Sequence, residues 1–187
     1  MGVRKYVLRI TRSAVLAAFL VTIQFLTAPL NNQFITGTAV NLLLIVSFLT
    51  CGPVVGLAVA AVSPLFAFLA GVGPAFPPII PFMVVGNMAL IGAWYLFGLL
   101  NRPGRPGRMY KVIQVLIAVG AAAIKFLVLY IGIVLWAVPY LLDINEKQGA
   151  LLTISFSYPQ LITATIGGLV ALTVAPLVQK AIKLQAI

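Results

Sequence analysis

Hydrophobic residues in this chain fall into six long runs, separated by short stretches rich in proline, glycine, asparagine and basic residues. The runs are continuous rather than alternating. Most approach the ~20 residues that cross the hydrocarbon core of a bilayer, so they predict membrane helices. The predicted helices cover 10–28, 38–50, 53–71, 81–100, 110–138 and 151–178. The second is clearly the shortest, and we expect the short helices to tilt, bend or pack against longer neighbours.

The segments between these runs differ in character. Residues 29–37 (PLNNQFITG) predict a polar turn, and 51–53 (CGP) a tight one. Residues 71–81 hold four prolines and cannot form a regular helix. Residues 101–108 (NRPGRPGR) form a basic turn, and 139–149 is the acidic segment.

The composition agrees with a protein dissolved in lipid. Of the 187 residues, 63% are hydrophobic and 7% are charged, whereas soluble domains carry about 25% charged residues. We therefore expect an all-α membrane protein, with residues 1–187 forming a single integral-membrane domain.

The charge pattern predicts the orientation. Ten basic residues flank the apolar runs at the two termini and the fourth connection, whereas the opposite side holds Lys147 beside Asp143 and Glu146. By the positive-inside rule, both termini lie in the cytoplasm of a bacterial cell membrane and the chain crosses it six times. The basic residues behind the net charge of +10 are thus explained by membrane topology, and we expect no nucleic-acid partner. The N-terminus also resembles a signal peptide, but cleavage would leave five spans and break the charge alternation.

Several function classes are excluded by the residues that are missing. The chain has no histidine, one cysteine (Cys51) and two acids, neither of which lies in an apolar run. We expect no metal ligands, no cofactor and no catalytic residues, hence no enzyme. A P-loop and an intramembrane proton relay are also missing. A small-molecule binding protein or a structural subunit remains.

Lys125 is the most unusual residue, because it interrupts the apolar run AAAIKFLVLY with no acid nearby. A lysine near the centre of a span costs roughly 2.5–3.5 kcal/mol on insertion scales. It lies about 21 Å along its helix from Lys111, at ~1.5 Å per residue, which places it in the outer half of the membrane. It either snorkels to the outer headgroups or faces a water-filled pocket, where a ligand supplies its partner.

Other polar residues are predicted at a similar depth, namely Asn41, Asn87, Tyr158 and Gln160. Each alone is commonly an interhelical hydrogen bond. Their grouping with Lys125 in the outer half of several helices favours a binding site. Phe76 and Phe82 flank the proline-rich segment. They form either part of an interfacial aromatic belt or a lid over a ligand.

Helix 10–28 carries a different signal. Ala14 and Ala18 lie four residues apart near its cytoplasmic end, a spacing that lets another helix approach closely. The motif is short and occurs in many membrane helices.

Taken together, the chain resembles the substrate-binding S component of an energy-coupling factor (ECF) vitamin transporter. The resemblance rests on six short spans, cytoplasmic termini, the AxxxA of Ala14 and Ala18, and the stretch from TGTAVNLLL to MVVGN, with its Gly-Pro turn, Ser63-Pro64 and proline-rich loop. It implies high-affinity binding of a vitamin in an outward pocket closed by external loops. It also implies docking through the two alanines on an ECF transmembrane coupling subunit, with two cytoplasmic ATPases supplying the energy.

The polar residues of the predicted site disfavour some vitamins but do not select a single one. Thiamin is a cation and would need an intramembrane acid. Cobalamin, with its amides and phosphodiester, suits the lysine and the amides and is favoured by the whole-chain resemblance. Pantothenate or another small acid fits through its carboxylate. A structural subunit without a ligand and a stand-alone facilitator stay open. The inner halves of the predicted helices 10–28, 53–71 and 81–100 carry almost no polar residues, which argues against a pore.

Overall fold

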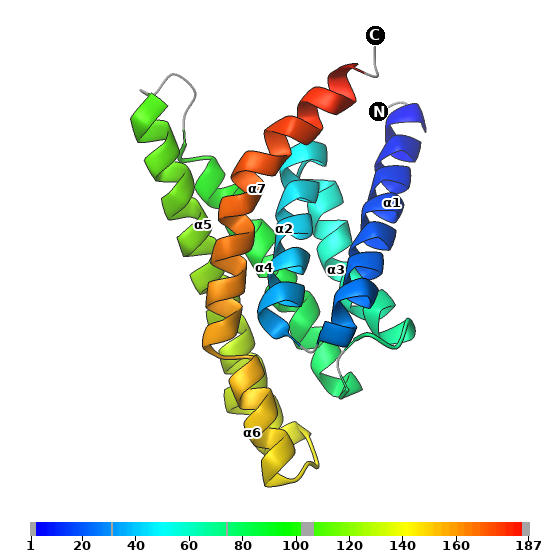
Figure 1. Cartoon of the computed structure of the whole chain (residues 1–187), viewed down its shortest axis with the longest axis vertical. Coiled ribbons are helices and arrows are strands. Elements are labelled where there is room, and N and C mark those ends of the chain that lie inside the picture. Colours follow the sequence, from blue (N-terminus) through cyan, green and yellow to red (C-terminus); the bar gives the residue numbers. More distant parts are fainter. Residues whose placement is uncertain (1–2, 31, 74, 102–106, 185–187) are drawn as a thin grey trace.

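The chain folds into a bundle of helices in the computed structural model, which describes residues 3–30, 32–73, 75–101 and 107–184 (Figure 1). The α-helices are α1 (Val3–Thr27), α2 (Gln33–Cys51), α3 (Pro53–Leu69), α4 (Ile80–Gly98), α5 (Gly107–Leu129), α6 (Glu146–Ser155) and α7 (Tyr158–Leu184). Two 3₁₀ turns, η1 (Ala28–Leu30) and η2 (Pro77–Ile79), precede α2 and α4, and the π-helix η3 (Tyr130–Leu141) continues α5. The all-helical prediction is confirmed.

The first half of the chain shows one wrong prediction. Segment 29–37 was expected to be a turn, but α2 begins at Gln33, because the Asn32 side chain accepts hydrogen bonds from the amides of Phe34 and Ile35 and caps the helix. The second helix is consequently not the shortest of the spans. α2 has 19 residues and α3 has 17.

The tight turn at 51–53 is present. Gly52 has φ +89°, a conformation that favours glycine, and Pro53 occupies the first turn of α3. Pro74, which was counted in the proline-rich loop, lies outside the described residues, and Pro81 sits in the first turn of α4.

The last two predicted helices are interrupted. The helix at 110–138 is α5 followed by the π-helix η3. The helix at 151–178 is divided into α6 and α7, with a break at 156–157. Pro159 follows the break and sits in the first turn of α7, where its missing N–H costs nothing.

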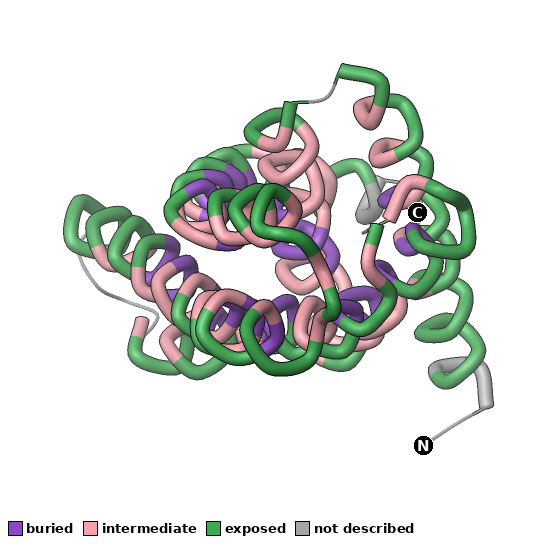
Figure 2. Tube along the Cα trace, turned by 90° about the horizontal axis from the view of Figure 1, so that it is seen from below, coloured by how far each residue is buried: buried purple, intermediate pink, exposed green. Residues whose placement is uncertain are grey.

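By length and composition, five helical stretches of the described chain can cross a membrane. They are Tyr6–Leu30, Gln33–Cys51, Pro77–Gly98, Gly107–Leu141 and Glu146–Ala181, and α3 is a shorter apolar helix. In the described chain α2, α3, α4, α5 and α7 form a ring in which each helix contacts the next and α7 closes on α2, and α1 packs against α2 and α3. Figure 2 shows the exposed positions on the outside of this ring.

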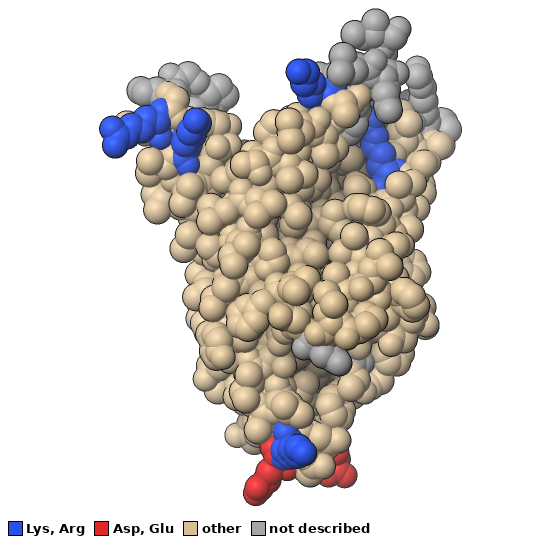
Figure 3. Space-filling model, in the orientation of Figure 1, with Lys and Arg blue, Asp and Glu red and all other residues tan. Residues whose placement is uncertain are grey.

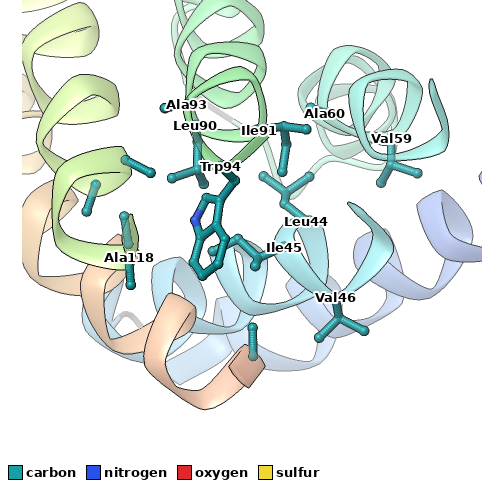
Figure 4. Close-up of a cluster of buried hydrophobic side chains, with 14 of the residues drawn as sticks. Leu44, Ile45, Val46, Val59, Ala60, Leu90, Ile91, Ala93, Trp94 and Ala118 are labelled. Carbon is teal, nitrogen blue, oxygen red and sulfur yellow. The ribbon is translucent and has the colours of Figure 1, made fainter. Parts of the chain in front are cut away.

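The apolar core fills the half of the bundle near the termini. Trp94 on α4 lies there among Leu44, Ile45 and Ile91, all fully or almost fully buried (Figure 4). On α2, α4 and α5 these core positions lie on the terminal side of Asn41, Asn87 and Lys125. The apolar core therefore closes the terminal end of the bundle beneath the polar residues.

α2 and α7 approach each other very closely. A Cβ atom on Gly167 would lie 2.8 Å from the backbone nitrogen of Leu42 and 2.9 Å from the Thr38 carbonyl oxygen. Only glycine fits there without moving a helix, so Gly167 fixes the distance between α7 and the part of α2 that carries Asn41.

Charge separates along the long axis of the molecule. Figure 3 shows basic side chains gathered at the end that carries both termini, and the acidic pair at the α6 end. Since the chain has two acids, this pair is Asp143 and Glu146. The predicted orientation in the membrane is based on this difference in charge between the two ends. Several side chains in the count lie outside the described part, namely those of Arg4, Lys5, Arg102, Arg105 and Lys183.

Candidate functional site

A cavity of about 360 Å³ lies in the half of the bundle away from the termini. It is bounded by α1, α2, α3, α4, α5 and α7, by the segment that follows α3 and by the end of α6. Its volume falls in the lower part of the ~300–1,000 Å³ range of small-molecule sites. Its polar lining residues are Gln24, Gln33, Thr36, Asn41, Ser63, Asn87, Lys125, Ser155 and Gln160.

Lys125 lies at the inner end of this cavity and is 3% exposed. Its Nζ donates hydrogen bonds to Asn41 Oδ1 at 2.6 Å and to Asn87 Oδ1 at 2.8 Å. The side chain therefore does not snorkel to the membrane surface. An ammonium group has three donors, so two are used within the described residues and one N–H remains for another acceptor.

The two asparagines bring α2 and α4 to the lysine of α5, as the sequence predicted for residues of similar depth. Asn41 is also tied to α7, because its Nδ2 donates to Thr163 Oγ1 at 3.3 Å. The Thr163 hydroxyl donates in turn to the Gln160 carbonyl at 3.4 Å. This network, which we call the Lys125 cluster (Lys125, Asn41, Asn87 and Thr163), joins four helices.

Thr163 was missed by sequence reasoning. It is 1% exposed and sits in an apolar run, three residues after the predicted Gln160. Its position could have indicated its role, because Thr163 lies about one helical turn after Gln160 and therefore on the same face of the helix.

The break between α6 and α7 forms one wall of the cavity. The Ser155 carbonyl oxygen at the end of α6 accepts from Gln160 Nε2 at 3.1 Å and also from Gln33 Nε2. Carbonyls in the last turn of a helix have no hydrogen-bond donor within the helix. Here the side chains of two glutamines donate to such a carbonyl. Gln33 was missed because its segment was expected to be a turn.

The opposite wall is formed by α1 and α3. Pro64 lies inside α3 and has no N–H to give to the Ala60 carbonyl, which instead accepts from the Ser63 hydroxyl at 3.5 Å. Gln24 of α1 lines the same cavity, and its buried Oε1 has no hydrogen-bond partner within the described structure. The cavity thus offers several amide and hydroxyl groups beside one cation.

Three predicted site residues lie elsewhere. Tyr158 is 57% exposed and does not line the cavity. Phe82 lies beside Trp136, with ring centroids 5.7 Å apart, in an apolar groove on the outer surface of α4 and η3. Phe76 packs against a small apolar cluster that includes Ile79 and Phe156. The predicted proximity to the cavity therefore holds for Lys125 with Asn41, Asn87 and Gln160.

The two alanines of α1 are on the surface. Ala14 and Ala18 are exposed, whereas Ala17 between them is 2% exposed and faces the core. They lie around the middle of α1, and neither lines the cavity. Both small side chains are therefore accessible on the surface of the bundle.

Comparison with known proteins gives one match. The family model of the ECF transporter substrate-specific component matches residues 8–179, nearly the whole chain. No curated protein and no solved structure matches.

The match agrees with the helical membrane architecture and with the cavity. Members of this family are binding subunits of transporters, not enzymes, and they work with an ECF coupling module. The chain is a multi-pass membrane protein and belongs to the family of substrate-specific (S) components of ECF transporters.

Proposed function

We propose that this S component binds a small vitamin that carries an acidic group, in the cavity at the Lys125 cluster, with pantothenate as the test compound. The observation that carries the proposal is the buried ammonium of Lys125. It faces the cavity with one N–H left over and has no carboxylate within hydrogen-bond distance among the described residues. An anionic ligand would supply both the missing acceptor and the opposite charge.

The size of the cavity favours the small acid over cobalamin. About 360 Å³ suits a ligand near the lower end of the small-molecule range. Cobalamin, with a corrin ring and a nucleotide tail, is much larger than the ligands that such cavities enclose. The preference for cobalamin came from whole-chain resemblance, and the family match does not specify a substrate.

The remaining lining suits the rest of such a molecule. Pantothenate has an amide and two hydroxyls in addition to its carboxylate. The side chains of Gln24, Gln160, Asn87 and Ser63 offer both donors and acceptors around the cavity. In this proposal Lys125 binds the carboxylate, and the amide side chains orient the uncharged part.

Transport itself would depend on partners. The exposed pair of Ala14 and Ala18 supports docking of α1 on the transmembrane coupling subunit, whose two ATPases would supply the energy. A structural subunit without a ligand is less well supported, because the family is a substrate-specific one and the cavity is lined by several amide and hydroxyl groups and by Lys125.

The proposal is tested by mass spectrometry of small molecules released from gently purified protein, followed by calorimetric titration. We expect a small carboxylic acid to co-purify, and pantothenate or that acid to bind with submicromolar affinity. A bound corrinoid would overturn the choice of ligand. If no vitamin co-purified, and none in a panel bound more tightly than micromolar, the binding role of the cavity would be wrong.

A further inference from the structure

The cavity at the Lys125 cluster also has an apolar end. Five of its lining residues belong to one small apolar cluster, to which η2, α4, α5, α6 and the break before α7 contribute. They are Ile79, Met83, Leu129, Leu152 and Phe156. Leu129 follows Lys125 by about one helical turn, or about 6 Å along α5, and so lies on the same face of that helix. One small molecule can therefore reach both the amine and the apolar end.

The position of Leu129 depends on Gly86 of α4. A Cβ atom on Gly86 would lie 2.5 Å from Leu129 Cδ2 and 2.7 Å from its Cγ, whereas carbon atoms pack at about 3.5–4.0 Å. Leu129 thus lies directly against the α4 backbone. It is 2% exposed and packs with Ile79, Ile133 and Phe156. A methyl group at position 86 would therefore displace Leu129 toward the cavity, which is the open space beside it.

This contact limits what the apolar end can hold. Apolar side chains bind apolar groups of a ligand because both lose contact with water. A bulky group would press on Leu129, which cannot retreat toward α4 because it already touches the backbone at Gly86. A compact aliphatic group fits without such a movement. Pantothenate has one, since a single carbon carries two methyl groups, separated from the carboxylate by two methylenes, the amide and a hydroxyl-bearing carbon.

We propose that Gly86 and Leu129 form a specificity-determining pair, which restricts the apolar end of the cavity to a compact, branched aliphatic group of the ligand. The inference rests on the proposed function, because it concerns the same cavity. It adds the kind of substrate group that this cavity selects. Leu129 borders the ligand, and Gly86 is a positioning residue that acts through Leu129.

The test is calorimetric titration of the full chain in detergent with two pairs of compounds. The first pair is pantothenate and its analogue without the two methyl groups. The second pair is pantothenol, which has an alcohol in place of the acid, and its analogue without the methyl groups. In both pairs we expect the dimethyl compound to bind the wild type about tenfold more tightly, because two methyl groups are buried.

Substitutions then locate the effect. Gly86→Ala should reduce this difference to about twofold or less, and adding Leu129→Ala, which removes the atoms that the new methyl group meets, should restore tighter binding of the dimethyl compounds. Leu129→Ala alone should bind the diethyl homologue of pantothenate at least as tightly as pantothenate, whereas the wild type should bind it roughly tenfold more weakly.

Gly132→Ala is the matched control for a clash between these elements. A Cβ atom there would lie 2.7 Å from Phe82 Cδ1, in the apolar groove on the outer surface. This variant should keep the tenfold difference. An equal loss of the difference in Gly86→Ala and Gly132→Ala would overturn the inference, and so would equal binding of the two members of each pair to the wild type.

The two proposals fail in different ways. If pantothenate and pantothenol bound equally, and both more tightly than their analogues, the acidic ligand would be wrong and the apolar end would stand. If pantothenate bound more tightly than pantothenol but no better than its own analogue, the role of Lys125 would stand and that of Gly86 and Leu129 would be wrong. If none of the four compounds bound, both proposals would be wrong.

Discussion

Lys125 Nζ on α5 lies 2.6 Å from Asn41 Oδ1 on α2, although 84 residues separate them in the chain. The hydrogen bond fixes a cation inside the membrane with neutral oxygen atoms as its partners. Neutral oxygens solvate the ammonium but do not cancel its charge. Within the described residues the amine is bonded to no acid, and in the proposal above an acidic ligand supplies that partner.

Lys125→Met should weaken binding of the acidic ligand by roughly 10–100-fold, the equivalent of one hydrogen bond to a charged group at ~1.5–3 kcal/mol. Calorimetric titration with pantothenate, or with the acid that co-purifies, measures this change. Lys111→Met is the matched control, because Lys111 is exposed on the same helix at the other end. If the Lys125→Met variant bound the ligand as tightly as the wild type, the ligand would not use the ammonium.

Thr163→Val should lower the free energy of unfolding by about 1–3 kcal/mol, because Asn41 Nδ2 loses its buried acceptor at nearly constant side-chain volume. It should also weaken ligand binding, since Asn41 then holds Lys125 less firmly. Melting in detergent and titration provide the two readouts. Thr173→Val is the control. Its hydroxyl is exposed and bonds only to the Val170 carbonyl of its own helix, so equal losses in both variants would contradict a role for the cluster.

Gly167→Ala should destabilise the protein by about 1–3 kcal/mol, because the added Cβ overlaps the α2 backbone near Asn41. Moving α2 away from α7 also displaces the Asn41 side chain, so we expect weaker ligand binding as well. Gly92→Ala in α4 adds the same methyl group where nothing lies within 4 Å. It should be neutral or slightly stabilising, and similar melting temperatures for the two variants would argue against the close approach of α2 and α7.

Ala18→Trp should abolish uptake in cells that contain the complete transporter while the affinity of the isolated chain stays unchanged. A bulky ring at this exposed position of α1 would prevent close packing of a partner helix, and Ala18 does not line the cavity. Leu96→Trp, at a 60% exposed position on α4, is the control for adding a large ring to the lipid-facing surface. If Ala18→Trp lowered binding together with uptake, the docking role would be wrong.

Tyr158→Ala and Phe82→Ala should leave the ligand affinity within about twofold of wild type, because neither residue lines the cavity. Gln160→Ala, two positions from Tyr158, should weaken binding, because its amide lines the cavity and donates to the Ser155 carbonyl. Titration of the three variants separates them. A larger loss for Tyr158 than for Gln160 would mean that the ligand binds outside this cavity.

Much of the fold was predictable because a membrane helix can be recognised from the residues of its own segment. Long apolar runs predict spans, and basic flanks predict orientation, without knowledge of neighbours. The predictions were wrong where the residues of a segment did not indicate clearly whether the segment forms a helix or a turn. The polar residues after Asn32 begin a helix because that side chain caps it. The apolar run at 151–178 predicts one helix, but the helix breaks at 156–157 and a new one begins at Tyr158.

The site was predictable only in part. Lys125, Asn41, Asn87 and Gln160 were found because polar residues in apolar runs are costly and therefore conspicuous. Thr163 and Gln33 were missed because a threonine in an apolar run and a glutamine in an expected turn carry no such signal. Tyr158 was predicted from its depth and Phe82 from its place beside the proline-rich segment, and neither feature says which face of a helix a side chain occupies.

The sequence by itself thus determined the membrane as solvent, the helical fold and the presence of a lysine within an apolar helix, because each follows from the cost of polar groups in lipid. The orientation of the helices stays a prediction from the basic flanks. Only the tertiary structure decided which helices surround that cation. The Lys125 cluster depends on four helices meeting at one level, and that meeting depends on contacts such as Gly167 against α2, far apart in the chain. The volume of the cavity, and with it the preference for a small ligand, follows from the same packing.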